Sequence, residues 1–65
     1  MSVIQIPEIG SIWLHHENVE YEVILIANEY SNDFTTLPVM VIYQSNNGHI
    51  WAKPLDEFFS EMEEL

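Results

Sequence analysis

The chain has 65 residues, of which 11 are aspartate or glutamate and only one, Lys53, is a lysine or arginine, so its formal net charge is −10. A DNA- or RNA-binding site needs several lysines or arginines to displace counterions from phosphates, and one lysine cannot supply it. Because there is no cysteine, disulfides and thiolate zinc sites are excluded as well. With 48% hydrophobic residues the chain can bury a small core, and we expect a single domain over residues 1–65.

The first predicted strand follows Gly10 and covers Ile12–His15, and residues 16–18 form the turn after it. The second covers residues 19–28, where side chains alternate with a period of two. This alternation predicts one face made of Tyr21, Val23, Leu25 and Ala27, and an opposite face made of Glu20, Glu22, Ile24 and Ile26.

A polar loop is predicted over residues 29–37, ending at Pro38. The β-branched and aromatic run 39–43 predicts the next strand. Residues 47–48, Asn-Gly, are a strong hairpin signal, because both types tolerate positive φ. The return strand is predicted over residues 49–53.

Pro54 ends this strand and opens a helix, because its fixed φ suits the first helical position. Helical spacing over the last eleven residues predicts one apolar face, made of Leu55, Phe58, Phe59, Met62 and Leu65. The opposite side carries five carboxylates, those of Asp56, Glu57, Glu61, Glu63 and Glu64.

Together these elements predict a mainly β fold: a small, SH3-like, partly open β-barrel of four to five strands with a short, acidic, amphipathic C-terminal helix. A three- or four-stranded sheet under one helix is the alternative. No segment approaches the roughly 18 apolar residues of a membrane span, and the first residues carry no secretory signal pattern. We therefore expect a cytoplasmic protein.

The acidic C-terminal run is the most informative part of the charge pattern. In a helix, Glu57 with Glu61 and Glu61 with Glu64 are like-charged neighbours, each costing about 0.2–0.5 kcal/mol. Residues 63 and 64 would also lie at the negative end of the helix dipole. This cost suggests that acidity serves binding, with solubility as the competing explanation. The predicted partner-binding residues are Glu20, Glu22, Asp56, Glu57, Glu61, Glu63 and Glu64.

A second candidate site combines aromatic residues with the single lysine. Most strand aromatics are expected in the core. Trp51 and Lys53, however, alternate on one face of the last predicted strand, and with Tyr43 they would form a cradle for a small anion or nucleotide. We expect no cofactor.

The histidines predict no metal site. On a strand, His15 and His16 point to opposite faces, and His49 is far away in the sequence at a turn. Catalysis is also not expected, because the chain has no nucleophile elbow, phosphate-binding glycine loop or metallohydrolase motif.

The chain resembles a family of short bacterial and phage proteins of unknown function that end in a Trp-x-(Arg/Lys)-Pro-Leu-x-x-Phe stretch. The resemblance rests on Gly10-x-x-Trp13-x-His15, Tyr21-Glu22-Val23, Ile26-Ala27, Val41-x-Tyr43, Gly48 and Trp51-x-Lys53-Pro54-Leu55-x-x-Phe58. It implies an SH3-like barrel and no particular activity, and Lys53 stands where arginine is usual. In character the chain is also similar to small acidic phage proteins that disable host enzymes or defence systems.

We therefore expect a non-enzymatic, phage-encoded inhibitor that imitates a nucleic acid and docks on a basic, nucleic-acid-binding surface of a host protein or defence effector. Direct nucleic-acid and membrane partners are not expected. Two alternatives remain: a barrel that binds a small ligand or nucleotide, and a module that self-associates through an edge strand or through Phe58, Phe59 and Met62.

Overall fold

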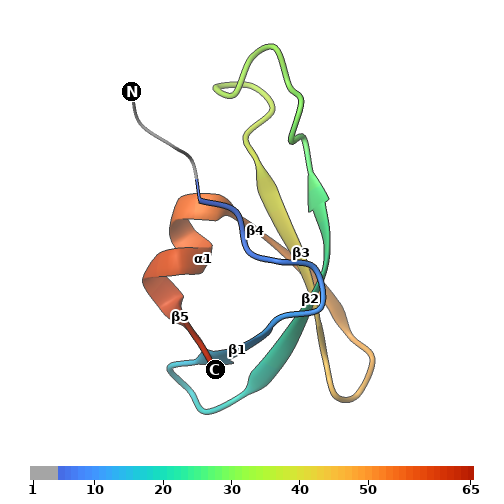
Figure 1. Cartoon of the computed structure of the whole chain (residues 1–65), viewed down its shortest axis with the longest axis vertical. Helices are drawn as coiled ribbons and strands as arrows, with labels where there is room; N and C mark the ends of the chain where they lie inside the picture. Colours follow the sequence, from blue (N-terminus) through green and yellow to red (C-terminus); the bar gives the residue numbers. More distant parts are fainter. Residues whose placement is uncertain (1–4) are drawn as a thin grey trace.

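The computed structural model describes residues 5–65, which form one antiparallel sheet and one short helix. The strand order is β4-β3-β2-β1-β5 (Figure 1). The elements are β1 (Ile12–His15), β2 (Glu20–Ala27), β3 (Met40–Ser45), β4 (Ile50–Pro54), α1 (Leu55–Glu61) and β5 (Met62–Glu64). The predicted mainly β fold is confirmed: five strands make an open, barrel-like sheet with a short helix near the C-terminus.

Two three-residue loops of the same design connect β1 to β2 and β3 to β4. The third loop residue is left-handed in both, Asn18 with a φ of 67° and Gly48 with a φ of 89°. In each loop the amide of the residue before it donates to the carbonyl of the residue after it, over 2.8 and 3.0 Å. This is a common three-residue hairpin, and glycine and asparagine adopt its left-handed position most readily. The predicted turn at 16–18 and the hairpin at 47–48 are confirmed. The expected two-residue turn is not: the loop spans residues 46–48, and of Asn47 and Gly48 only Gly48 has a positive φ.

A β-bulge in β2 changes which residues face the core. Tyr21 and Val23 face inward, but the register with β3 shifts between Val23 and Leu25. As a result Leu25 is 59% exposed, and Ile26 packs against the core instead. The predicted placement of Leu25 and Ile26 is wrong, because one extra residue in a strand moves the side chains after it to the other face.

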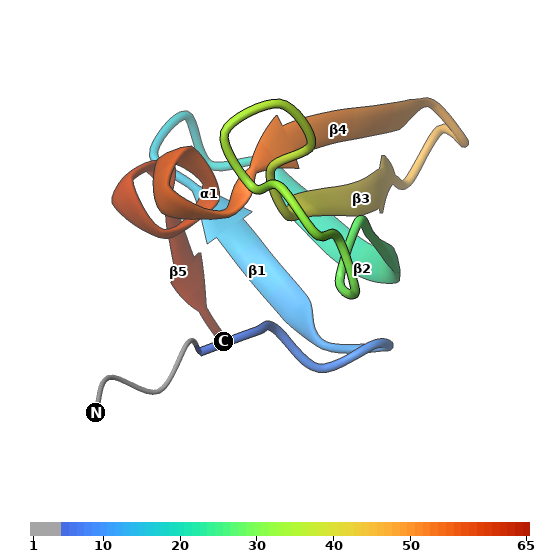
Figure 2. The same cartoon turned by 90° about the horizontal axis from the view of Figure 1, so that it is seen from above.

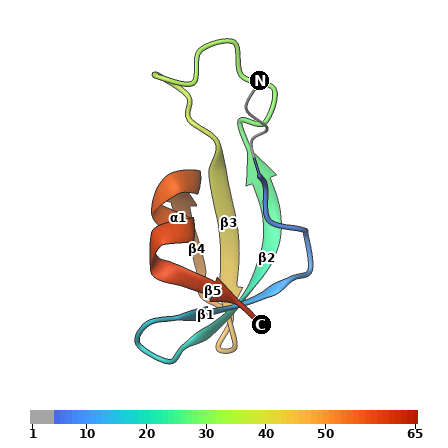
Figure 3. The ribbon, with the colours of Figure 1, turned by 60° about the vertical axis from the view of Figure 1, so that its left-hand side comes forward.

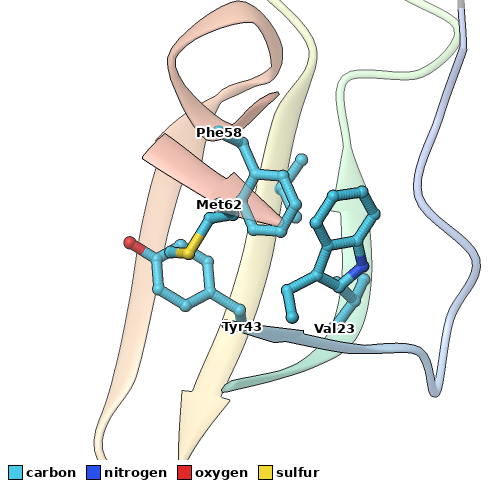
Figure 4. Close-up of a cluster of buried hydrophobic side chains, with 6 residues drawn as sticks. Val23, Tyr43, Phe58 and Met62 are labelled. Atoms are coloured by element: carbon cyan, nitrogen blue, oxygen red, sulfur yellow. The ribbon is translucent and has the colours of Figure 1, made fainter. Parts of the chain in front are cut away.

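The core lies between the sheet and the helix α1. We call the face of the sheet that packs against α1 the inner face. Phe58 and Met62 point toward Tyr43 and Val23 of the sheet (Figure 4). Phe58 is fully buried and meets Trp13 edge-on, with ring centroids 4.9 Å apart, while its centroid lies 5.6 Å from that of Tyr43. One helical residue therefore packs on both β1 and β3, and such aromatic pairs add to the gain from apolar burial.

The C-terminal run is helical only as far as Glu61, and Met62–Glu64 pair antiparallel with β1 as β5. The predicted helix over residues 55–65 is therefore wrong at its C-terminal end. Pairing gives hydrogen-bond partners to backbone groups of β1 that a continuing helix would leave without them. Phe58 and Met62 still reach the core, as their spacing indicated.

The helix α1 lies between the two edge strands of the sheet. Figure 2 shows it beside β4 and β5, and it contacts β3 as well. The preceding residue, Pro54, has a φ of −58°, and the amide of Leu55 donates to the carbonyl of Val39 over 3.0 Å. Within residues 5–65, no helix is long and apolar enough to cross a membrane.

The predicted polar loop connects β2 to β3 and projects beyond the sheet (Figures 1 and 3). At its base, the side-chain amide of Asn28 donates to the carbonyl of Pro38 over 2.8 Å. Within the loop, the carboxylate of Asp33 accepts hydrogen bonds from the hydroxyl of Thr36 and the amide of Thr35, at 2.8 and 3.0 Å. These bonds lower the pKa of Asp33, that from the Thr36 hydroxyl most, and give the loop its own internal order.

The bulge predicts that truncation of Leu25 and truncation of its neighbour Ile26 change stability by different amounts. Leu25→Ala is expected to change the free energy of unfolding by about 0.5 kcal/mol or less, as at other exposed positions. Ile26→Ala is expected to lower it by about 1–2 kcal/mol, because it removes methyl groups from the edge of the core. Urea unfolding followed by tryptophan fluorescence measures both, and a larger loss for Leu25→Ala would contradict the bulge.

Candidate functional site

The outer face of the sheet, directed away from α1, carries a row of carboxylates. Residues directly opposite one another in antiparallel strands share a face, and successive residues alternate. Trp13 and Tyr21 are opposite one another and belong to the inner face. The next row therefore lies on the outer face, and in it Leu14 is flanked by Glu20 of β2 and Glu63 of β5.

Glu22 extends this group, since it lies opposite Ile12 on one side and Gln44 on the other. We call Glu20, Glu22 and Glu63 the outer carboxylates; all three are exposed. The strand geometry sets their backbones about 7 Å apart along β2 and about 10 Å apart across the sheet. The separation along β2 is shorter than the Debye length at physiological salt, about 8 Å, and the separation across the sheet is slightly longer, so salt weakens the combined field of the three charges without removing it.

The other four predicted partner-binding residues lie elsewhere. Asp56 and Glu57 are exposed on α1, which covers the inner face. Glu64 is opposite Trp13 and so belongs to the inner side, at the β5 edge. Glu61 makes an ion pair and is described below. The structure thus gathers three of the seven predicted residues on one surface and does not join the remaining four to them.

The energetic argument for an acidic helix also changes. Because α1 ends at Glu61, residues 63 and 64 lie on a strand and do not oppose a helix dipole, and Glu61 and Glu64 are not helical neighbours. Glu57 and Glu61 remain one turn apart, but the charge of Glu61 is compensated. The helix therefore carries much less electrostatic cost than the sequence suggested.

Glu61 is the centre of a polar cluster on the inner side. Its Oε1 lies 3.2 Å from the ammonium of Lys53 and 3.4 Å from Nε2 of His15. The Nδ1 of His15 accepts the amide of Glu17 at 3.1 Å, so in the neutral ring Nε2 carries the proton and donates to Glu61. The hydrogen bond from Lys53, and then the one from His15, lower the pKa of Glu61, while Glu61 raises the pKa of Lys53.

The structure does bring together the three residues of the predicted ligand site. Tyr43 is opposite Trp51, and Lys53 is opposite the buried Val41, so all lie on the inner face. Trp51 is 50% exposed, whereas burial raises the pKa of Tyr43. Because Lys53 is paired with Glu61, it has less positive charge to offer to an anion than the sequence alone indicated.

The expectation that the neighbouring histidines point apart is wrong. β1 ends at His15, and His16 lies in the three-residue loop, where strand alternation no longer applies. The two imidazole centroids are 4.0 Å apart, and one donor atom from each ring and one carboxylate oxygen of Glu61 all lie within 4.8 Å of one another. His49 directly follows the other three-residue loop and is not part of this group.

Residues 11–64 match the model of a family described as "Protein of unknown function (DUF1653)". The chain belongs to this family. No curated protein and no solved structure matches it. The matched segment contains all six helix and strand elements described above, so the family covers the whole sheet together with α1.

Sequence reasoning did not find the cluster of Lys53, Glu61 and His15. His15 and Glu61 are 46 residues apart, and no spacing rule connects them. One signal was available: Asn18 at the third position after His15 fits a three-residue loop, which takes His16 out of the strand. The position of Glu61 beside these rings, however, follows from where α1 packs.

The ion pair of Lys53 and Glu61 predicts a pH dependence of stability. The pKa of Glu61 is lowered from its ordinary value of 4.5, so its contribution is full above pH 4.5 and is lost as pH falls through the lowered pKa. The pKa of Lys53 is raised above 10.5, so the alkaline limit lies beyond that value. Glu61→Gln is therefore expected to be less stable than the wild type at about pH 7, and the difference is expected to shrink as pH falls below 4.5.

Glu57→Gln is the control for this comparison, because it removes the same charge one helical turn earlier, where no ion pair is present among the described residues. The comparison distinguishes the effect of losing the Lys53–Glu61 ion pair from the effect of reducing the repulsion among the many acidic residues. Urea unfolding at about pH 7 and in a series of buffers below pH 4.5 measures the difference in the free energy of unfolding. Equal stabilities of the two variants at about pH 7 would contradict a stabilising pair.

Proposed function

We propose that this protein is a non-enzymatic binding protein that docks the outer face of its sheet on a basic surface of a partner protein. The observation that supports this most directly is the arrangement of the outer carboxylates, Glu20 and Glu22 on β2 and Glu63 on β5, two strands that are separated only by β1. Within residues 5–65 none of the three makes an ion pair, so their charge remains available to a partner.

The position of the single lysine strengthens this proposal. Lys53 is the only lysine or arginine in the chain, and it lies on the inner face beside Glu61. The outer face therefore has no lysine or arginine to reduce its negative field. A charged face of one sign attracts an oppositely charged surface and accelerates encounter with it.

The outer face also offers apolar area between its charges. Leu14 separates Glu20 from Glu63, and Ile12, which is 38% exposed, lies beside Glu22. An open cavity of about 310 Å³ is lined by Ile12, Glu20 and Glu22 and continues to the loop between β3 and β4. Apolar surface framed by charges is typical of a protein-binding face, since the apolar part contributes affinity and the charges select the partner.

The nucleic-acid site of a host enzyme or defence effector is the natural target, because such a site is built to accept closely spaced negative charge. In this proposal the chain is phage-encoded, acts in the host cytoplasm and blocks that site. For the alternative of self-association, Phe58 and Met62 are buried in the core and Phe59 packs against it, which favours an edge strand over this stripe as the contact.

Capture from a bacterial lysate tests the proposal with two variants of equal charge change. Glu22→Lys/Glu63→Lys reverses two outer carboxylates, and Asp56→Lys/Glu57→Lys reverses two on α1. The outer pair is expected to reduce capture of the main partner about tenfold or more, because like charges facing each other cost several kcal/mol. The helix pair is expected to leave capture largely intact.

Mass spectrometry identifies the captured protein, and circular dichroism verifies that both variants are folded. Added double-stranded DNA is expected to release the partner if its nucleic-acid site is the one occupied. Equal loss in the two variants would attribute binding to net charge alone, and unchanged capture by the outer variant would eliminate the outer face as the site.

A further inference from the structure

We infer that the side chains of His15, His16 and Glu61 form a binding site for a divalent metal ion that prefers imidazole ligands, such as Zn²⁺. One donor atom from each of these three side chains lies within 4.8 Å of the other two. Two imidazole nitrogens and one carboxylate oxygen are a recurrent set of protein ligands for zinc. None of these three side chains is an outer carboxylate, although Glu63 lines the same cavity as they do, so zinc binding can be tested independently of the proposed function.

Three separate parts of the fold supply the ligands. His15 ends β1, His16 begins the loop to β2, and Glu61 is the last residue of α1. His15 and Glu61 already lie 3.4 Å apart, at Nε2 and Oε1. A bound ion would thus join the end of the helix to the end of β1, which are distant in sequence.

The side chains lie where an ion can reach them. They line an open cavity of about 380 Å³ that also includes Phe59 and Asn18. His16 is exposed, and the side chain of Glu61 is 35% exposed. Three protein ligands leave one position of a tetrahedral ion open to this cavity, where water can complete the coordination.

The ammonium of Lys53 already contacts Glu61 and would compete with a metal ion for it, but the carboxylate can contact the lysine and the ion at the same time. The contacts of Glu61 with Lys53 and His15 both use Oε1. A carboxylate has about four acceptor positions on its two oxygens, so Oε2 can face an ion while Oε1 keeps the lysine. The net charge of −10 further favours entry of a cation.

The carboxylate of Glu17 can orient the imidazole ring of His15. Binding of an ion at Nε2 of His15 requires the ring proton to be on Nδ1, and Oε1 of Glu17 lies 3.5 Å from that atom. Metal-bound histidines commonly donate their other ring proton to such a carboxylate, which fixes the tautomer. The amide of Glu17, which now donates to Nδ1, lies on an exposed turn where water can accept it.

Calorimetric titration of the full chain with Zn²⁺, and separately with Mg²⁺, tests the site. We expect one Zn²⁺ per chain and much weaker binding of Mg²⁺, because imidazole ligands favour zinc and magnesium prefers oxygen ligands alone. Equal binding of the two ions would overturn the inference, since it would show only attraction to a negative protein. Absence of zinc binding would overturn it as well.

His16→Ala is the decisive variant, and His49→Ala is its matched control. His16 is exposed, and its ring packs beside that of His15, so its removal leaves the core unchanged. It is expected to weaken zinc binding by at least the roughly 10–100-fold that the loss of a supporting partner costs. His49→Ala is expected to bind like the wild type, and the opposite order of the two variants would overturn the assignment.

A measurement on the unmodified protein does not depend on whether a variant folds. In proton NMR spectra, zinc is expected to shift the imidazole signals of His15 and His16 and to leave those of His49 in place. A shift confined to His49, or equal shifts of all three, would overturn the site.

Discussion

The structure depends above all on the packing of Phe58 against Trp13 and Tyr43. The helix that carries it has only seven residues, too few to be stable on its own, so its position is fixed by this buried contact. Once Phe58 is in place, the chain that follows reaches the open edge of β1 and pairs with it as β5. The same helix carries Glu61 to Lys53 and His15.

The distribution of charge follows from this packing. A chain with eleven acidic residues and one lysine cannot neutralise its surface, and the position of that lysine decides which carboxylate it can neutralise. Lys53 lies opposite Val41 on the inner face and is held by Glu61. The outer face consequently keeps its carboxylates uncompensated, although no motif in the sequence marks it as a site.

The candidate sites could be predicted only in part. Glu20 and Glu22 were placed on one face by the alternation of β2, and this held because both precede the bulge. Glu63 joins them because Met62–Glu64 is a strand and not the helix that the pattern indicated. The cluster of His15 and Glu61 was not predicted, because it joins two elements through a tertiary contact that no local spacing records.

The sequence by itself determined the first four strands, the two tight loops and the start of the helix, because these features depend on alternation, on Pro54 and on residues that tolerate positive φ. Only the tertiary structure decided the bulge in β2 and the end of α1. Phe58 and Met62 are four residues apart, a spacing that keeps two side chains on one face of a helix and also of a strand. Residues 62–64 form a strand and do not continue the helix because they pair with the open edge of β1. That edge is distant in sequence and becomes a neighbour only after folding.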